Sequence, residues 1–464
     1  MKLGWLSAAA VMMAPGVQAQ QRPDQQAFFG LYKELVETNT TQSAGSCTQA
    51  AAQIGARLGA AGFTDRQLTY FSVPEHPKDG GLVAVLPGTD MRAKPMLLLA
   101  HIDVVEAKRA DWQRDPFTLI EENGYYYGRG TLDDKVQAAI WADTLIRLRQ
   151  QGYRPKRTIK LALTCGEETS GAFNGAEWLA ANRRQLIDAE FALNEGGGGR
   201  TDGKGKLLVQ TIQVGEKAYQ DFTLTATNPG GHSSAPVRDN AIYALSEAML
   251  RVRDHEFPLQ FNDVTRAFFT KSGPLRGGDM GRAMVALAAN PQDRAAEAIV
   301  NTDKGFHSML RTTCVATMVD AGHALNALPQ RATANVNCRM FPGNTAAQTQ
   351  AALTAAIGNA AITIVPRVTD KPIAIQPPLD PKIMRPVETL AARYYPGVPV
   401  IPTMSTGATD GVYMEAVGIP TYGVPSVWGD PDGNGTHGLN ERVEVRAVYT
   451  ARDYLFDLVK ALAG

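Results

Sequence analysis

Short runs of hydrophobic residues alternate with longer amphipathic segments in the first half of the chain. Four runs are almost wholly apolar and lie at residues 82–86, 95–100, 159–163 and 191–193. Unbroken apolar runs of this length are typical of strands buried on both faces of a sheet. A helix is predicted from Lys135, because apolar residues follow at helical spacing: Ala138, Trp141, Ala142, Leu145 and Leu148. The alternation predicts an α/β fold with a mainly parallel sheet.

The hydrophobic pattern changes after about Gln213. Residues 222–226 alternate between apolar and polar, which is typical of a strand with one solvent-facing side. The elements predicted next are a helix at 241–252, an irregular stretch to about His307 with a helical segment at 283–289, strands at 312–319 and 332–338, a helix at 345–357 and a strand at 361–365. This order predicts an inserted α+β domain of the ferredoxin-like kind. We therefore assign residues 20–213 and 373–464 to the α/β domain and residues 214–372 to the insertion.

The first residues follow the pattern of a secretory signal. Lys2 precedes an apolar stretch, Leu3–Val17, which is too short and too interrupted by Pro15 to span a membrane. Val17-Gln18-Ala19 reads as a cleavage site after small residues, so residues 1–19 are expected to be removed. The alternative is a buried N-terminal helix. No later segment has the length of apolar sequence that a membrane span needs, and we expect export to the periplasm or the exterior.

Composition narrows the classes of protein that remain. Among 464 residues, 46 Lys and Arg balance 46 Asp and Glu, which argues against a nucleic-acid binder and against a basic membrane-surface protein. The 44% of hydrophobic residues argues against intrinsic disorder. The chain has four cysteines, Cys47, Cys165, Cys314 and Cys338. None of them belongs to a CxxC pair, which argues against a zinc site built from cysteines. Cys314 and Cys338 lie in two strand-like runs, where a disulfide and two buried free thiols are both open.

Histidines and carboxylates cluster just after the predicted strands. The motifs are His101-Ile102-Asp103, Gly128-Arg129-Gly130-Thr131-Leu132-Asp133-Asp134-Lys135, Thr164-Cys165-Gly166-Glu167-Glu168, Asn194-Glu195-Gly196 and Gly435-Thr436-His437-Gly438-Leu439-Asn440-Glu441. Each alone is explained as well by a core histidine, a solvated turn or an exposed acidic pair. Together they place two histidines and several carboxylates at one rim of one sheet, where open α/β folds bind ligands. Imidazole and carboxylate without thiolate suits Zn²⁺, with Co²⁺ or Mn²⁺ as substitutes.

This set of motifs resembles the M20 family of metallopeptidases, the group of carboxypeptidase G, aminoacylase and succinyl-diaminopimelate desuccinylase. The resemblance covers nearly the whole chain after residue 19. It implies a zinc exopeptidase-like catalytic domain with a lid domain inserted into it, and a site for two Zn²⁺ ions. The implied ligands are His101, Asp133 and Glu195 for one ion and Asp133, Glu168 and His437 for the other. Asp133 would bridge the ions, because the bridging Asp of the family stands two residues before the Lys, here Lys135.

The same resemblance assigns the remaining roles. Glu167 would be the general base, and Asp103 would hold the His101 imidazole from behind. Gly230-Gly231-His232-Ser233-Ser234-Ala235-Pro236 resembles the family loop whose His reaches toward the substrate carbonyl. Arg339 would bind a free substrate carboxylate, and the segments around Asn326 and Gly407 would line the same pocket. The lid is the usual dimer surface of the family, which implies a homodimer in which His232 serves either its own or the neighbouring subunit.

The leading functional hypothesis is therefore an exported dinuclear-zinc hydrolase. It would cleave the amide bond of a peptide, a dipeptide or an N-acyl amino acid that carries a free carboxylate, with a metal-bound hydroxide and a Glu general base. Carboxypeptidase and N-acyl-amino-acid hydrolase activities are not separated, because both require the same carboxylate contact. The alternative is a catalytically silent protein that binds a peptide or a metal on the same fold. A dinucleotide enzyme is set aside, because Gly196–Gly199 lacks the GxGxxG spacing.

Overall fold

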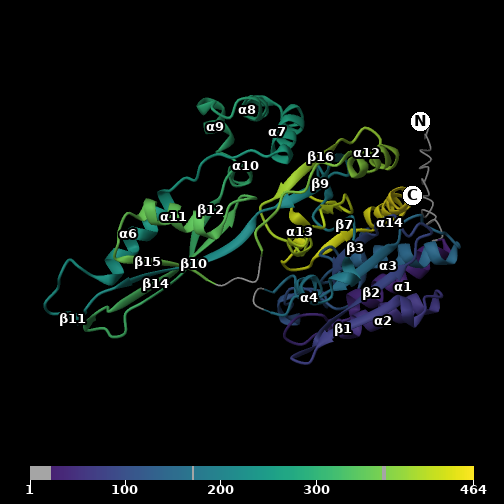
Figure 1. Ribbon diagram of the computed structural model, residues 1–464, viewed down its shortest axis with the longest axis horizontal. Helices are drawn as coiled ribbons and strands as arrows, with labels where there is room; N and C mark the ends of the chain where they lie inside the picture. Colours follow the sequence, from purple (N-terminus) through teal and green to yellow (C-terminus); the bar gives the residue numbers. More distant parts are fainter. Residues whose placement is uncertain (1–21, 170–171, 368–371) are drawn as a thin grey trace, which may run out of the picture.

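The computed structural model describes residues 22–169, 172–367 and 372–464, and the predicted signal segment lies outside them. The chain forms a two-part molecule, with a sheet domain at one end and a smaller elongated domain at the other (Figure 1). Within the described residues, no helix combines the length and the apolar character that crossing a membrane requires.

A ten-stranded sheet forms the centre of the larger domain. Its strands, in spatial order, are β1 (Leu68–Val73), β2 (His76–Leu86), β6 (Ile159–Thr164), β3 (Met96–His101), β7 (Phe191–Asn194), β17 (Thr421–Gly423), β9 (Leu207–Glu216), β8 (Gly198–Thr201) and β18 (Trp428–Gly429), with β16 (Val400–Ser405) paired to β9. The middle of the sheet is parallel, since β3 pairs in parallel with β6 and β7, and β17 with β7. The predicted α/β fold with a largely parallel sheet is confirmed.

Helices cover both faces of this sheet, and strand β3 shows why its sequence is apolar throughout. Leu98 and Ala100 face a core shared with α1 (Pro23–Glu37), α2 (Cys47–Ala60), α3 (Lys135–Gln150), α12 (Pro381–Tyr394) and α14 (Val445–Ala463). Leu97 and Leu99 face a second core shared with α4 (Gly175–Asn182) and α13 (Gly411–Ala416). Because successive side chains of a strand point to opposite faces, an unbroken apolar run fills both cores.

The smaller domain has a four-stranded antiparallel sheet with two helices. Its elements in chain order are β10 (Ala218–Thr227), α6 (Ala241–Asp254), β12 (Thr313–Ala321), β14 (Arg331–Met340), α11 (Ala346–Ile357) and β15 (Ile362–Pro366). The spatial order β12-β14-β10-β15 is that of a ferredoxin-like sheet. Phe222, Leu224 and Val336 pack against Leu245 and Leu353 of the two helices in a core separate from that of the larger domain. We call residues 218–366, apart from the four helices described next, the lid.

The stretch expected to be irregular contains four helices, so that expectation was wrong outside residues 283–289, where a helical segment was predicted and is found. They are α7 (Asp263–Arg276), α8 (Gly278–Ala289), α9 (Arg294–Val300) and α10 (Lys304–Met309). Pro274 lies inside α7 and Gly277 separates α7 from α8, so the helical spacing of apolar residues is interrupted and hard to see in the sequence. Val264, Phe269 and Leu287 belong to the core of the larger domain, and α7 lies against β16 (Figure 1).

All four cysteines are bridged. Cys314 and Cys338 face each other across β12 and β14 and form one disulfide, so the pairing that the sequence left open does form. The second disulfide joins Cys47, at the start of α2, to Cys165, directly after β6. Its partners are 118 residues apart, and the sequence analysis did not anticipate it.

The chain crosses from the sheet domain into the lid at Lys217, which is fully buried. Its Nζ donates hydrogen bonds to the carbonyl oxygen and the hydroxyl of Ser308, at 3.0 and 3.2 Å, and to the hydroxyl of Thr313, at 3.0 Å. Burial, reinforced by the charges of Arg339 and Arg311, lowers the pKa of Lys217 from 10.5 to about 7.

Lys217 should make stability depend on pH in a defined window. Between pH 7 and 10.5 the unfolded chain keeps this proton while the folded chain loses it, so the free energy of unfolding rises with pH there. The slope is at most about 1.4 kcal/mol per pH unit. Urea unfolding at pH 7 and pH 9 should therefore show the wild type gaining about 2 kcal/mol relative to Lys217→Met. A difference between the two proteins that stays constant with pH would contradict this reading of Lys217.

Candidate active site

The predicted metal ligands meet at the carboxyl ends of three adjacent strands. His101 is the last residue of β3, Glu168 follows β6 and Glu195 follows β7. Because β3 pairs in parallel with both of the other strands, their carboxyl ends lie at the same edge of the sheet. Asp133 lies in the loop directly before α3, and His437 comes from a loop near the end of the chain.

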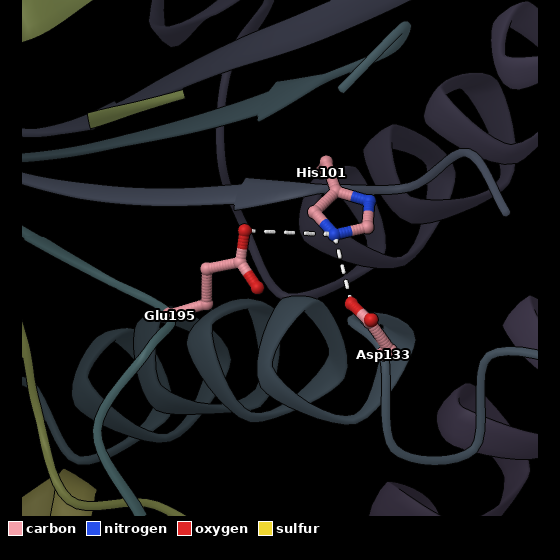
Figure 2. A group of neighbouring side chains, drawn as sticks. All are labelled: His101, Asp133 and Glu195. Carbon is pink, nitrogen blue, oxygen red and sulfur yellow. Dashed lines mark hydrogen bonds and ion pairs between the residues drawn. The ribbon is translucent and has the colours of Figure 1, made fainter. Parts of the chain in front are cut away.

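One group of ligands surrounds the Nε2 atom of His101. This atom lies 3.1 Å from Oδ1 of Asp133 and 3.7 Å from Oε1 of Glu195. Figure 2 shows both carboxylates directed at the same imidazole nitrogen, opposite the strand that carries the ring. The imidazole is buried, with 2% of His101 exposed, so the strand end fixes its position.

The second group surrounds the Nε2 atom of His437. This atom lies 3.0 Å from Oδ2 of Asp133 and 3.0 Å from Oε2 of Glu168. Asp133 thus presents one carboxylate oxygen to each histidine, which is the arrangement a bridging ligand requires. His437 has a φ of 56°, a left-handed conformation that is uncommon for residues other than glycine. Such conformations concentrate at functional sites, where the surrounding structure holds them.

The chemistry of these two groups fits two divalent cations. Within each group the ligand atoms lie within 4.8 Å of one another, close enough to share one ion. Burial, followed by the charges of Asp133 and Asp134, raises the pKa of Glu195 well above its ordinary value against the opposing effect of His101. Partly buried carboxylates of this kind need positive charge nearby. Imidazole nitrogens and carboxylate oxygens together are the ligands that Zn²⁺ binds in hydrolases.

The hydrogen bonds of the site keep Asp133 ionised. Burial alone would raise the pKa of Asp133, but hydrogen bonds to His101 and His437 outweigh it and lower the pKa below its usual range. Hydrogen bonds to Asp133, which has the larger effect, and to Glu168 raise the pKa of His437 to about 10. Bound cations would replace these protons on the histidines, because a histidine must be neutral to bind metal.

Asp103 contacts both halves of the site. The Nδ1 atom of His101 lies 3.1 Å from the Asp103 carbonyl oxygen and 3.6 Å from its carboxylate Oδ1. The Asp103 carboxylate also accepts hydrogen bonds from the backbone amides of Glu167, at 3.4 Å, and Glu168, at 3.1 Å. The sequence analysis expected the contact with the imidazole and missed the contact with the amides. Asp103 therefore fixes the glutamate pair as well as the histidine.

Glu167 lies beside the two ligand groups and belongs to neither of them among the described residues. Its side chain is half-buried. Burial, followed by the charges of Asp410, Glu168 and Asp103, raises the pKa of Glu167 to about 8 against the opposing effect of His101. A carboxylate next to a metal site that is not itself a ligand is free to exchange protons with a substrate.

Glu441 was missed by the sequence analysis as a functional residue, although it ends the His437 motif. It is fully buried and accepts hydrogen bonds from the backbone amides of Gly130, at 3.0 Å, Leu132, at 2.7 Å, and Asp133, at 3.1 Å. Nη1 of Arg129 donates to the same carboxylate at 2.7 Å, and Nη2 donates to the Gly438 carbonyl at 2.7 Å. One buried ion pair therefore joins the loop of Asp133 to the loop of His437.

Glu441→Gln should destabilise the protein and weaken metal binding together. The substitution leaves the buried guanidinium of Arg129 without its carboxylate, which costs about 3–5 kcal/mol when one partner of a buried pair is lost. It also replaces an acceptor at the Asp133 amide by a group that can donate. The matched control is Glu444→Gln, whose ion pair with Arg446 is partly exposed and should cost below about 1 kcal/mol. Thermal unfolding and Zn²⁺ affinity, measured on both variants, test this, and equal effects would contradict it.

The predicted substrate contacts lie in two different parts of the structure. His232 lies on the two-residue strand β11 (Gly231–His232), paired with β13 (Ala327–Leu328), and is exposed. Its Nδ1 accepts a hydrogen bond from the Ser234 amide at 3.1 Å. Figure 1 shows β11 at the tip of the lid, away from β3 and β7. Asn326, directly before β13, is exposed at the same tip. His232 and Asn326 are therefore not brought to the ligand groups in this conformation.

Arg339 and Gly407 lie nearer to the sheet domain. Arg339 is at the end of β14 that faces that domain, with its guanidinium 4.8 Å from the centroid of the Tyr219 ring. Burial lowers the pKa of Arg339, opposed by nearby acidic groups that include Glu167. Gly407 lies in the loop that leads from β16 to Asp410.

Asp410 is a second residue that the sequence analysis did not single out for a role. Its carboxylate is buried and accepts hydrogen bonds from Asn174 Nδ2, at 2.7 Å, and from the Thr164 hydroxyl, at 2.9 Å. Asn174 also donates to the Gly166 carbonyl at 3.2 Å. The loop of Gly407 is thereby attached to the backbone just before Glu167. An acidic residue in a glycine-rich loop was the available signal, but its partners are far away in sequence.

Two known proteins are similar in sequence to most of this chain. An N-fatty-acyl-amino acid synthase/hydrolase of Homo sapiens is 27% identical over 435 residues, covering 92% of this chain and 85% of that protein. A probable carboxypeptidase S-like protein of Dictyostelium discoideum is 27% identical over 392 residues, covering 80% of this chain and 72% of that one.

Solved structures agree on the fold. An M20 family metallo-carboxypeptidase from Sulfolobus solfataricus superposes with a TM-score of 0.72 at 18% identity, covering 96% of this chain and 100% of that one. A dinuclear metal binding peptidase of the M20 family from Bacillus subtilis gives a TM-score of 0.58 at 15% identity, covering 94% of this chain and 98% of that one.

The sequence model of one family matches most of the chain. It is described as peptidase family M20/M25/M40 and matches residues 97–461, a span that holds all five predicted metal ligands and Glu167. The family resemblance stated from the motifs is confirmed, and with it the prediction of an enzyme. The chain belongs to peptidase family M20/M25/M40.

Proposed function

We propose that the protein hydrolyses the amide bond of a peptide, a dipeptide or an N-acyl amino acid that carries a free carboxylate. The observation that supports this most is the pair of ligand groups that share Asp133, with Glu167 beside them. Two carboxylate–imidazole groups joined by one carboxylate suit a dinuclear centre, and a neighbouring free carboxylate supplies acid–base chemistry.

Two Zn²⁺ ions are the proposed cofactors, with Co²⁺ or Mn²⁺ as substitutes. His101, Asp133 and Glu195 would hold one ion, and Asp133, Glu168 and His437 would hold the other. Bound there, the ions would act as Lewis acids that polarise the substrate carbonyl and lower the pKa of water toward neutrality. The carboxylates of Asp133, Glu168 and Glu195 would offset most of the added charge.

The residues of the chain would carry the proton transfers. The Glu167 carboxylate would accept a proton from the attacking water and then donate it to the nitrogen of the leaving amine. Asp103 would keep the glutamate pair in place through the two backbone amides and would orient His101. The alternative of a catalytically silent binding protein is less favoured, because a silent protein has no use for a carboxylate in the position of Glu167.

The names of the relatives support one substrate class. A fatty-acyl amino acid and the end of a peptide both have an amide bond next to an amino acid with a free carboxylate. Arg339 is the proposed partner of that carboxylate, since a guanidinium binds it in bidentate fashion. His232 and Asn326 would contribute only when the tip of a lid reaches the site, either by movement of the lid or from a second subunit.

We also propose export and pairing through the lid. The signal pattern in residues 1–19 and the presence of two disulfides support an oxidising compartment. Pairing of two lids is supported by apolar side chains on the edge strand β12, where Val315, Met318 and Val319 are 59%, 69% and 61% exposed. Sedimentation velocity measures whether the purified protein is a dimer.

A hydrolysis screen tests the proposed activity. Purified protein is assayed with dipeptides and with N-acyl amino acids from acetyl to palmitoyl, before chelation, after chelation and after return of Zn²⁺. The proposal predicts hydrolysis that is lost on chelation and returns with the metal. It also predicts that the same substrates with an amidated carboxylate are poor, because Arg339 loses its partner. Hydrolysis that survives complete removal of metal, or no hydrolysis of any member of the series, would contradict the proposal.

A further inference from the structure

The disulfide that the sequence did not predict lies two residues before the proposed general base. Cys165 directly follows β6 and precedes Gly166, Glu167 and Glu168, and its partner Cys47 is the first residue of α2. We propose that the Cys47–Cys165 disulfide is a positioning element of the active site, which holds the Glu167–Glu168 segment where catalysis and metal binding need it. This inference rests on the proposed function for the roles of the two glutamates.

Cys47 is held in place by the hydrogen bonds and the packing of α2. Ser46 caps α2 by accepting a hydrogen bond from the Gln49 amide at 3.2 Å. The Thr48 hydroxyl donates to the Pro77 carbonyl at 2.8 Å and accepts from the Gly80 amide at 2.9 Å, which ties the start of the helix to β2. The same helix buries Ile54 and Leu58 in the main core, so Cys47 has little freedom to move.

On the Glu167 side of the bridge, the contacts among the described residues are hydrogen bonds, including one of 3.2 Å from Asn174 Nδ2 to the Gly166 carbonyl. After β6 the chain leaves the sheet, and α4 does not begin until Gly175. The Gly175 amide donates to the Cys165 carbonyl at 2.7 Å, and the Asp103 carboxylate accepts from the amides of Glu167 and Glu168. Gly166 has a φ of 93°, in the left-handed region that favours glycine. Cys165 is the last residue before the two glutamates that a disulfide joins to another part of the chain.

Removing the two sulfur atoms would leave space beside the Glu167–Glu168 segment. A cavity of about 10 Å³ is lined by both cysteines, Asp103 and Gly166. Both cysteines are buried, with 2% of Cys47 and 4% of Cys165 exposed, so removing the sulfur atoms would enlarge this cavity beside the Asp103 carboxylate. A displacement of about 1 Å at a catalytic group can cost 10²-fold in rate.

The positioning role predicts unequal effects on the two metal sites, because only one of the two ligand groups contains Glu168. Glu168 belongs to the group with Asp133 and His437, whereas the other group takes Glu195 from β7. If the bridge positions the Glu167–Glu168 segment, opening it should weaken one metal site and leave the other unchanged. A disulfide that only stabilises the fold would not distinguish between the two sites.

The experiment compares two double variants, each lacking one disulfide. Cys47→Ala/Cys165→Ala removes the bridge at the site, and Cys314→Ala/Cys338→Ala removes the bridge in the lid as the matched control. Metal-free full-length proteins are titrated with Co²⁺ by calorimetry and visible absorption, at a temperature where thermal melts show all of them folded. For the site variant we expect one Co²⁺ site weakened about tenfold or more, the other within about twofold, and kcat lowered about tenfold or more with little change in KM. For the control we expect both affinities and kcat within about twofold of the wild type.

Several outcomes would overturn the proposal. These are unchanged affinities and kcat in the folded site variant, equal weakening of both metals, or the same losses in the lid variant. Should the site variant fail to fold, the wild type is reduced under mild conditions, labelled at the freed thiols and analysed by mass spectrometry. The loss of Co²⁺ affinity should then follow the labelled fraction of Cys165 and be reversed by reoxidation when no label is added. Opening of this bridge without such a loss would overturn the proposal.

The same measurements distinguish failure of the positioning role from failure of the proposed function. If the wild type hydrolyses no amide while the site variant loses affinity at one Co²⁺ site, the positioning role stands and the proposed function fails. If the wild type is an active hydrolase and the site variant matches it in kcat and in both affinities, the proposed function stands and the positioning role fails.

Discussion

Glu167→Gln is expected to lower kcat by about 10³-fold while the protein still binds two metal ions per chain, within the 10²–10⁴ that general acid–base catalysis contributes. Glutamine has the same shape but cannot take a proton from water or return one to the leaving amine. The side chain is in neither ligand group among the described residues, so the metal sites should persist. Because the substrate contacts are unaltered, KM should change by less than about threefold. Steady-state kinetics and metal analysis of the same preparation measure both effects.

The matched control for this variant is Glu121→Gln, on the exposed strand β4 (Ile120–Glu122). It makes the identical chemical change at an exposed position and should leave kcat within about twofold of the wild type, since exposed charges act weakly through solvent. Near wild-type kcat in Glu167→Gln would remove Glu167 from the mechanism. Loss of one metal along with activity would instead make Glu167 a ligand.

Asp133→Asn is expected to abolish measurable hydrolysis and to remove both metal ions at once. Asp133 is the residue that the two ligand groups share, with one oxygen 3.1 Å from His101 and the other 3.0 Å from His437. An amide offers only one oxygen and no charge, so it cannot bridge two cations. The metal content of the purified variant, measured by inductively coupled plasma mass spectrometry, should fall from two ions per chain to below one.

The neighbouring residue provides the control for Asp133. Asp134 is an adjacent carboxylate in the same loop, is buried and lies in neither ligand group among the described residues. Asp134→Asn makes the identical chemical change and should keep both metal ions and activity within about tenfold of the wild type. Loss of both metals in Asp134→Asn and their retention in Asp133→Asn would reverse the assignment of the bridging residue.

Much of the fold and of the site could be predicted because the signals are local. The run at residues 95–100 is apolar throughout, and β3 buries alternate side chains of that run in two different cores. His101 follows at once, so the position of one ligand is fixed by where the strand ends. The same logic places Glu168 after β6 and Glu195 after β7.

What the sequence did not reveal depends on contacts between distant segments. Glu441 holds three amides of a loop about 310 residues earlier, a relation visible in the separations of 308 to 311 residues between donor and acceptor. Cys47 and Cys165 meet because α2 packs against β2, which is the neighbour of β6 in the sheet. Helices α7, α9 and α10 show no clear period in the sequence, because Pro274 interrupts α7 and the other two helices have only 7 and 6 residues. Their burial is decided by packing against the larger domain.

The central claim is a dinuclear centre that catalyses hydrolysis only when both sites are filled. The most direct test is to titrate metal-free protein with Zn²⁺ while recording hydrolysis of the best substrate from the screen. The dinuclear site predicts that activity rises to its maximum at two equivalents per chain and remains low after the first. Full activity at one equivalent, or without added metal, would contradict it.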